Sequence, residues 1–146
     1  MIAVETNVLV YAHRREVAEH HAAAEVVRGL AEGAEPWGIP WPCLYEFVSV
    51  VTNRRIWRSV ASTPAQAWAQ VRGWCASPGC ALLGETEDFL PLLESFALRP
   101  RVLGPVIHDA RIAAICTAHG VHELLTRDRD FSSFPELRVR NPFAPS

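Results

Sequence analysis

Five acidic residues stand where their carboxylates could carry out chemistry: Glu5, Glu46, Asp109, Asp128 and Asp130. Carboxylates gathered at one place repel one another, and all 14 basic residues of the chain are arginine, so no lysine is available to neutralise them. A hard divalent cation bound through oxygen, magnesium or manganese, is the simplest remedy. Such ions act on phosphodiesters by generating hydroxide and by offsetting charge on the attacking and leaving oxygens. The acids therefore predict metal-dependent phosphoryl chemistry.

Two of these acids are expected to be buried, which favours a role in binding a cation. Glu5 ends a short apolar run that is typical of a buried strand, where a carboxylate is costly to desolvate unless a cation meets it. Asp109 precedes Ile112 and Ala113 by three and four residues, so it should lie on the packed side of its helix. The alternative for Asp109 is a first-turn aspartate stabilised by the helix dipole.

The other three acids are candidates because of where they lie relative to predicted strands. Glu46 lies opposite the apolar stripe of its helix and taken alone would be a solvated glutamate, but it follows a predicted strand within two helical turns. Asp128 and Asp130 follow another predicted strand in the segment TRDRDF, where the alternative is a turn with ion pairs to neighbouring arginines. Ligands of parallel sheets sit beyond the carboxyl ends of the strands, so these acids should converge there.

The elements that must position the acids alternate along the chain. Strands are predicted at 2–4, 37–40, 80–83 and 123–126, and LRVRN at 137–141 is a candidate fifth. Helices are predicted at 16–30, 43–55, 63–74, 86–98 and 105–120. The third of these helices has Ser62 or Thr63 as N-cap with Pro64 just inside. We therefore expect an α/β fold: a single three-layer α/β/α domain over residues 1–146 with a central parallel sheet of four to five strands.

Composition narrows the class of protein. The chain has 146 residues and 49% hydrophobic content, which suits one domain, and a net charge of −2 disfavours coating nucleic acid by bulk charge. Its start lacks the features of a signal peptide, and no run approaches the roughly 18 apolar residues of a membrane span, so a soluble cytoplasmic protein is expected. The glycine motifs of nucleotide-triphosphate and dinucleotide sites do not occur. The four dispersed cysteines are expected to be reduced thiols.

Four segments, in order and spacing, resemble the acidic motifs of PIN-domain ribonucleases. They are ETNVLVYA at the start, LYEFVSVVTN, HDARIAAICTAHGV and LLTRDRDF. The later FPELRVRNP is similar to the tail of one branch of VapC-like toxins, the toxins of type II toxin–antitoxin pairs. The match runs over nearly the full length of the chain, and its strength lies in the combination of motifs.

The resemblance implies a magnesium- or manganese-dependent endoribonuclease that cleaves RNA, is neutralised by a VapB-like antitoxin and forms a homodimer. The implied catalytic acids are Glu5, Glu46, Asp109 and Asp128. Of these, Glu5, Asp109 and Asp128 would hold the metal. The implied accessory residues are Asn7, Thr126 and Asp130.

One departure from the family pattern bears on activity. The first acid of the family is ordinarily aspartate, and Glu5 stands there in this chain. The extra methylene would displace the carboxylate by about one bond length, whereas magnesium requires near-octahedral geometry at roughly 2.0–2.1 Å. Activity would then be reduced, or the backbone would compensate. This departure keeps open a catalytically attenuated PIN fold that serves as a protein-binding module, and a small-substrate magnesium-dependent phosphohydrolase is a further alternative.

Arginines and aromatic residues offer further candidate contacts. Arg54, Arg55 and Arg58 form a local basic group that could bind RNA phosphates, and a solvated helix end is the alternative. The five tryptophans could stack on bases or receive antitoxin side chains, although core or dimer packing is the more common use. The histidines lack the spacing of a zinc site.

Overall fold

A parallel sheet forms the centre of the molecule. The computed structural model describes residues 1–144. Within them, five short strands pair in the order β3-β2-β1-β4-β5, and every pairing is parallel. The strands are β1 (Ile2–Val4), β2 (Trp37–Pro40), β3 (Cys80–Leu83), β4 (Glu123–Leu125) and β5 (Arg138–Arg140). The predicted parallel sheet is confirmed, and the candidate fifth strand is part of it.

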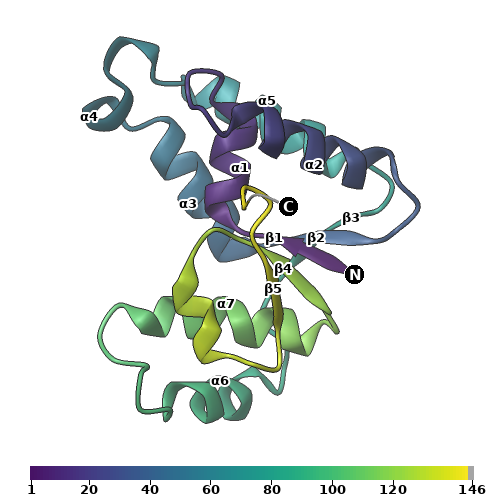
Figure 1. The fold of residues 1–146 in the computed structure, drawn as a ribbon, viewed down its shortest axis with the longest axis vertical. Helices are drawn as coiled ribbons and strands as arrows, with labels where there is room; N and C mark the ends of the chain where they lie inside the picture. The colour runs from purple at the N-terminus through teal and green to yellow at the C-terminus, as the bar shows by residue number, and fades with distance from the viewer. Residues whose placement is uncertain (145–146) are drawn as a thin grey trace.

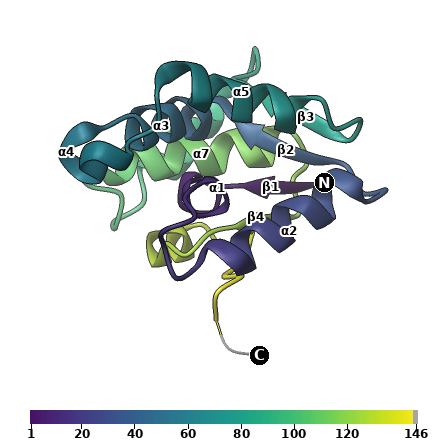
Figure 2. The ribbon, with the colours of Figure 1, turned by 90° about the horizontal axis from the view of Figure 1, so that it is seen from above.

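Helices cover both faces of this sheet. They are α1 (Thr6–His13), α2 (His20–Glu32), α3 (Trp41–Val51), α4 (Arg54–Trp57), α5 (Pro64–Cys75), α6 (Phe89–Ala97) and α7 (Val106–Ala118), with short 3-10 turns η1 (Arg58–Val60) and η2 (Arg129–Ser133). Figure 1 shows α2 and α5 on one side of the sheet and α6 and α7 on the other, and Figure 2 shows the same layers from above. The expected three-layer α/β/α architecture is therefore confirmed.

The central strands β1, β2 and β4 are buried, whereas the edge strand β5 is exposed. Ala3, Val4, Ile39, Leu124 and Leu125 have no exposed surface. Such strands read as continuous apolar runs rather than alternating ones, as expected when helices cover both faces. The stripe predicted for α7 is also buried, including Ile112, Ala113 and Cys116.

Local signals located several helices well. Thr63 caps α5 through a reciprocal capping box with Gln66, and Pro64 opens the helix, as predicted. The helix predicted to begin at residue 16 begins at His20 instead. The helix predicted for 43–55 begins earlier, at Trp41, and ends at Val51. Residues 54 and 55 belong to the separate helix α4.

Helix α1 had no counterpart in the sequence prediction. The apolar run VLVYA carries no helical stripe, and Val8, Leu9 and Val10 are all buried in a helix that packs against α2 and α3. This helix starts directly after β1, so Glu5 is its N-cap residue. The β1–α1 junction is therefore a strand end and a helix start at once.

The cysteines are reduced, as expected. All four cysteines are free thiols, and Cys43 and Cys116 are buried. None of the helices in residues 1–144 has the length and hydropathy needed to cross a bilayer.

Candidate active site

Glu5 is held at the carboxyl end of β1 by neutral hydrogen-bond donors. Its carboxylate accepts a hydrogen bond from the backbone N–H of Asn7 at 3.3 Å, in the manner of an N-cap, and another from the side-chain amide of Asn7. The Thr126 hydroxyl, at the end of β4, donates to the same carboxylate oxygen at 3.1 Å. The side chain is 7% exposed, and this burial raises the pKa of Glu5.

No cationic side chain contacts Glu5 within residues 1–144, so the expected cationic partner is absent from the protein itself. The register explains the neutral partners: Val4 pairs with Leu125, so Glu5 and Thr126 leave adjacent strands side by side. Asn7 donates to Thr126 at 3.1 Å and accepts from the backbone N–H of Arg127 at 3.2 Å. Asn7 and Thr126, both predicted accessory residues, thus tie the start of α1 to the segment after β4.

Asp128 lies at the end of that segment. Its backbone N–H donates to the Thr126 hydroxyl at 2.9 Å, and its carboxylate caps η2 by accepting from the backbone N–H of Asp130 at 2.8 Å. Asp128 is thereby connected to Glu5 through a single shared hydroxyl. An Asp at an N-cap with its side chain turned back to the chain is a common local structure, and here it presents two carboxylates on one short turn.

Asp109, in the first turn of α7, faces that turn. One carboxylate oxygen from each of Asp109, Asp128 and Asp130 lies within 4.8 Å of the others. Asp109 is half-buried, and its pKa is raised to about 6, first by desolvation and then by the negative charges of Asp128, Asp130 and Glu46. The predicted inward-facing position of Asp109 matches this geometry.

Glu46 reaches the site from α3. It is exposed, as its position opposite the apolar stripe suggested, and it accepts a hydrogen bond from the Thr6 hydroxyl at 3.1 Å. A cavity of about 310 Å³ is lined by three acids, Glu5, Glu46 and Asp128. Asp128 therefore belongs both to this cavity and to the group of three aspartates.

The structure thus brings together all five acids that were singled out in the sequence, but it divides them differently. Glu5, Asp109 and Asp128 were the expected metal ligands. The group close enough to share one ion contains Asp130 in place of Glu5. The negative charge of Glu46 raises the pKa of both Glu5 and Asp109, whereas the charges of Asp128 and Asp130 act on Asp109.

The three aspartates fit a hard divalent cation. In an octahedral magnesium site, adjacent oxygens lie about 2.9 Å apart and opposite ones about 4.1 Å apart. Carboxylate oxygens that lie within 4.8 Å of one another are near enough for one such ion to bind all three aspartates, and the ion would offset their mutual repulsion. Half-burial of Asp109 and the repulsion that raises its pKa are what an ion would relieve.

Several lining residues were not expected. Thr6 orients Glu46, and Tyr11 and Val50 line the cavity beside Glu5. Trp57, one of the five tryptophans considered as candidate contacts, lines the same cavity. Thr6 stands between two candidate residues in the sequence, which is the one local signal that could have marked it. The aromatic residues come from helices far apart in sequence, and no local pattern indicates that they share a wall.

The predicted RNA-binding arginines do not line the cavity that contains the acids, whereas Trp57 does. Arg54, Arg55 and Arg58 are exposed on α4 and η1, next to the cavity wall that contains Trp57. Trp37 and Trp74 are buried in the core, in keeping with the more common use of tryptophan, and Trp68 is exposed. Trp57 donates to the backbone carbonyl of Val50 and contacts the Arg14 guanidinium.

Comparison with known proteins identifies the family to which this chain belongs. Residues 2–137 match the model of the PIN domain. A VapC ribonuclease of Mycobacterium bovis, Mb2897, is 36% identical over 142 residues, which are 97% of this chain and 95% of that protein. Ribonuclease VapC31 of Mycobacterium tuberculosis is 30% identical, with 97% and 99% covered.

Solved structures show the same fold. VapBC2 from Rickettsia felis, bound to a promoter DNA fragment, superposes with a TM-score of 0.70 at 18% identity and covers 97% of this chain and 98% of that one. VapC20 of Mycobacterium tuberculosis, described as a sarcin-ricin loop cleaving toxin, gives 0.65 at 20% identity, with 91% and 94% covered. Together with the sequence relatives, these matches show that the chain belongs to the PIN-domain family, in the branch that contains the VapC ribonucleases.

Proposed function

We propose that this protein is a metal-dependent endoribonuclease and the toxin of a toxin–antitoxin pair, with the whole chain, residues 1–146, acting as one nuclease domain. The observation that carries the proposal is the meeting of Asp109, Asp128 and Asp130 beside a cavity that also contains Glu5 and Glu46. The family relationship to VapC ribonucleases, over nearly the full length of both chains, supports the reaction and the substrate class.

Magnesium or manganese is the cofactor that this oxygen-only site suits, with Asp109, Asp128 and Asp130 as ligands. When bound, such an ion generates hydroxide and offsets charge on the phosphodiester oxygens. Asp109 must lose its proton to bind the ion. Asn7 and Thr126 hold Glu5 and the Asp128 turn in register, and Thr6 holds Glu46 at the cavity. Glu46, exposed and hydrogen-bonded on one oxygen, is the acid best placed to accept a proton from water at the cavity.

The partners follow from the same relationship. RNA is the proposed substrate, a VapB-like protein the proposed antitoxin, and a homodimer the proposed assembly, all in the cytoplasm. Several structural neighbours are toxin–antitoxin complexes, including VapBC2 from Rickettsia felis. Co-expression with the product of a short neighbouring reading frame should yield a complex without ribonuclease activity, and light scattering of the free protein should give twice the chain mass. A stable monomer, or a complex that still cleaves, would contradict the corresponding part.

The decisive experiment is RNA cleavage with controlled metal. Total RNA incubated with millimolar manganese or magnesium should be cut at internal sites, and EDTA should stop the reaction. Full activity in EDTA would exclude the metal site. Hydrolysis of a generic phosphate ester without cleavage of RNA would favour the small-substrate phosphohydrolase. Inertness toward both would favour the protein-binding module, which the buried and hydrogen-bonded state of Glu5 already makes the second candidate.

A further inference from the structure

Two further cavities continue from the acidic site along η2. Asp128 lines the cavity that contains Glu5 and also a neighbouring cavity of about 380 Å³, which includes Arg129 and Ser132. Ser132 in turn lines a third cavity of about 430 Å³, together with Arg101 and Ser133. Each cavity shares a lining residue with the next, so the three cavities follow one another along η2, starting from the acids.

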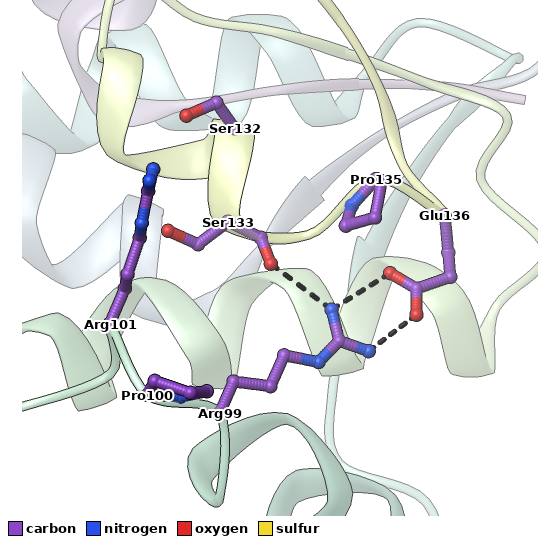
Figure 3. A pocket seen from close by; sticks show the side chains of 7 residues that line it. All are labelled: Arg99, Pro100, Arg101, Ser132, Ser133, Pro135 and Glu136. Atoms are coloured by element: carbon purple, nitrogen blue, oxygen red, sulfur yellow. Dashed lines mark hydrogen bonds and ion pairs between the residues drawn. The ribbon is translucent and has the colours of Figure 1, made fainter.

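The second and third cavities, here called the η2 track, are lined by several side chains that can donate hydrogen bonds to anions. Arg129, Ser132 and Asn141 are exposed in the second cavity. In the third, Figure 3 shows the Arg101 guanidinium extending alongside η2, on the same side of the pocket as the hydroxyls of Ser132 and Ser133. Arginine and hydroxyl side chains are the groups that most often bind the phosphate oxygens of nucleic acids.

The arginines of the track differ in whether their charge is already neutralised. Arg99 forms a two-point ion pair with Glu136, donates to the Ser133 carbonyl and lies over the Phe96 ring, so its role is structural (Figure 3). Arg127 is paired with Glu19. By contrast, Arg101 and Arg129 form no ion pair with a carboxylate among residues 1–144, so their charges remain available to a ligand.

From these observations we propose that the η2 track binds the phosphodiester backbone of RNA on one side of the cleavage site, with Arg101 and Arg129 as the phosphate-binding side chains and Ser132 and Ser133 as additional donors. The proposal rests on the proposed ribonuclease function, because it says where the RNA substrate lies beside the cleavage site. The track has donors along its length and few large apolar side chains, which suits a phosphodiester chain better than the apolar face of a partner helix.

RNA binding without cleavage tests the track directly. A labelled single-stranded RNA of 12 nucleotides is titrated in EDTA, where no ion can recruit RNA to the acids, and its integrity is checked on a gel. Replacing both arginines, Arg101→Gln with Arg129→Gln, should weaken binding at least about tenfold. The dependence of log K on log salt should flatten by about 1.4, since each lost contact to single-stranded nucleic acid contributes about 0.7.

Three controls make the result specific. Arg72→Gln, on α5 across the sheet, removes an arginine that is also exposed and forms no ion pair within residues 1–144, and it should change binding less than twofold. Arg101→Lys with Arg129→Lys should recover most of the affinity, because a phosphate contact needs the charge. Polyglutamate, at equal charge concentration, should compete poorly. Equal competition by polyglutamate would overturn the assignment to RNA in favour of an acidic peptide.

Failure of the track and failure of the ribonuclease assignment give different results. Suppose that the parent protein cleaves RNA and that the double glutamine variant binds and cleaves RNA as well as Arg72→Gln does. This result would overturn the track but leave the ribonuclease assignment in place. A parent that binds RNA through Arg101 and Arg129 but does not cleave it with metal overturns the catalytic assignment and leaves the track in place. Melting temperatures of all variants should match the parent within a degree or two, and a collapse of the double glutamine variant with loss of the Lys rescue would count against the track.

Discussion

Glu5 and the three aspartates occupy neighbouring parts of one site but are stabilised in opposite ways. Glu5 is buried, and its carboxylate already accepts hydrogen bonds from Asn7 and Thr126. Asp109, Asp128 and Asp130 are more open, and their carboxylates crowd within 4.8 Å of one another. Hydrogen bonds within the protein stabilise the Glu5 carboxylate, whereas the three aspartate carboxylates repel one another.

This difference suggests two roles: Glu5 holds the elements of the site together, and the three aspartates bind the metal ion. A buried carboxylate that is hydrogen-bonded to two elements fixes how those elements meet, and Glu5 joins the start of α1 to the end of β4. A group of like charges without neutralising partners is held in place by the fold at a cost in stability, which a cation would remove. We therefore expect changes in the aspartate group to alter metal binding most, and changes at Glu5 to alter the arrangement of the site.

The largest effect is expected at Asp109. Asp109→Asn keeps the shape and removes one negative charge, so the protein in EDTA should melt at a higher temperature than the parent. The metal-induced rise should largely disappear, because a neutral amide oxygen is a poorer ligand. For the parent, an ion at a hundred times its Kd adds about 2.7 kcal/mol, or several degrees. The cleavage rate should fall at least about a hundredfold, which corresponds to losing roughly 3 kcal/mol of charge stabilisation in the transition state.

Melting curves in EDTA and in millimolar manganese check this prediction for each protein. Asp88→Asn is the matched control, since Asp88 is an exposed aspartate at the start of α6 whose side chain forms no cap. It should leave both the metal shift and cleavage unchanged. A variant of Asp109 that is less stable than the parent in EDTA, yet keeps its full metal shift, would make Asp109 a structural helix-start residue.

A smaller effect on metal binding is expected at Glu5. Glu5→Gln retains an oxygen that can accept the hydrogen bonds of Asn7 and Thr126, so most of the metal shift should survive. Glu5→Asp restores the family's usual residue and should preserve or increase cleavage. Glu5→Ala removes the acceptor and the cap, which costs about 1 kcal/mol of stability, and should abolish cleavage because the Asp128 turn loses its anchor.

Metal titrations followed by melting and by RNA cleavage distinguish the roles of Glu5. If Glu5→Gln loses the metal shift as completely as Asp109→Asn, then Glu5 is a ligand and the contrast between the two regions disappears. Cleavage by Glu5→Ala at the parent rate would remove Glu5 from the site altogether.

The smallest expected effect is a pH dependence of stability in the metal-free protein. The pKa of Asp109 is raised to about 6 from an ordinary value of 3.8, so the folded protein holds this proton more tightly than the unfolded chain. The stability that this group contributes is fully present below about pH 4 and is lost as the pH rises through about 6. The advantage of Asp109→Asn over the parent should therefore grow between pH 5 and pH 7.5.

Melting temperatures of the two proteins in EDTA, at pH 5 and pH 7.5, measure that growing difference. Glu5 also has a raised pKa, but it is common to both proteins and largely cancels in the comparison. The metal shift of the parent should be weaker at pH 5, because protons compete for Asp109. A constant difference across this range would mean that Asp109 titrates normally.

Local patterns in the sequence determined most of the fold. The apolar runs of β1, β2 and β3 and the capped start of α5 depend on residues within a few positions of one another, so their bounds were predictable. The inward position of Asp109 followed from the spacing of the α7 stripe in the same way. Helix α1 was not predictable, because burial by neighbouring elements on several sides removed the periodicity that identifies a helix.

The sequence by itself also predicted which acids lie near one another, from their positions after strands or within the helices that follow them, and the structure places these acids around one rim. Only the tertiary structure decided how those acids are grouped. Asp130 lies in the close group, on the short turn that Asp128 caps, whereas Glu5 lies outside the group and accepts a hydrogen bond from Thr126, 121 residues away. Partners at that separation meet through the register of β1 with β4, and strand register depends on packing across the whole sheet rather than on any local run of residues.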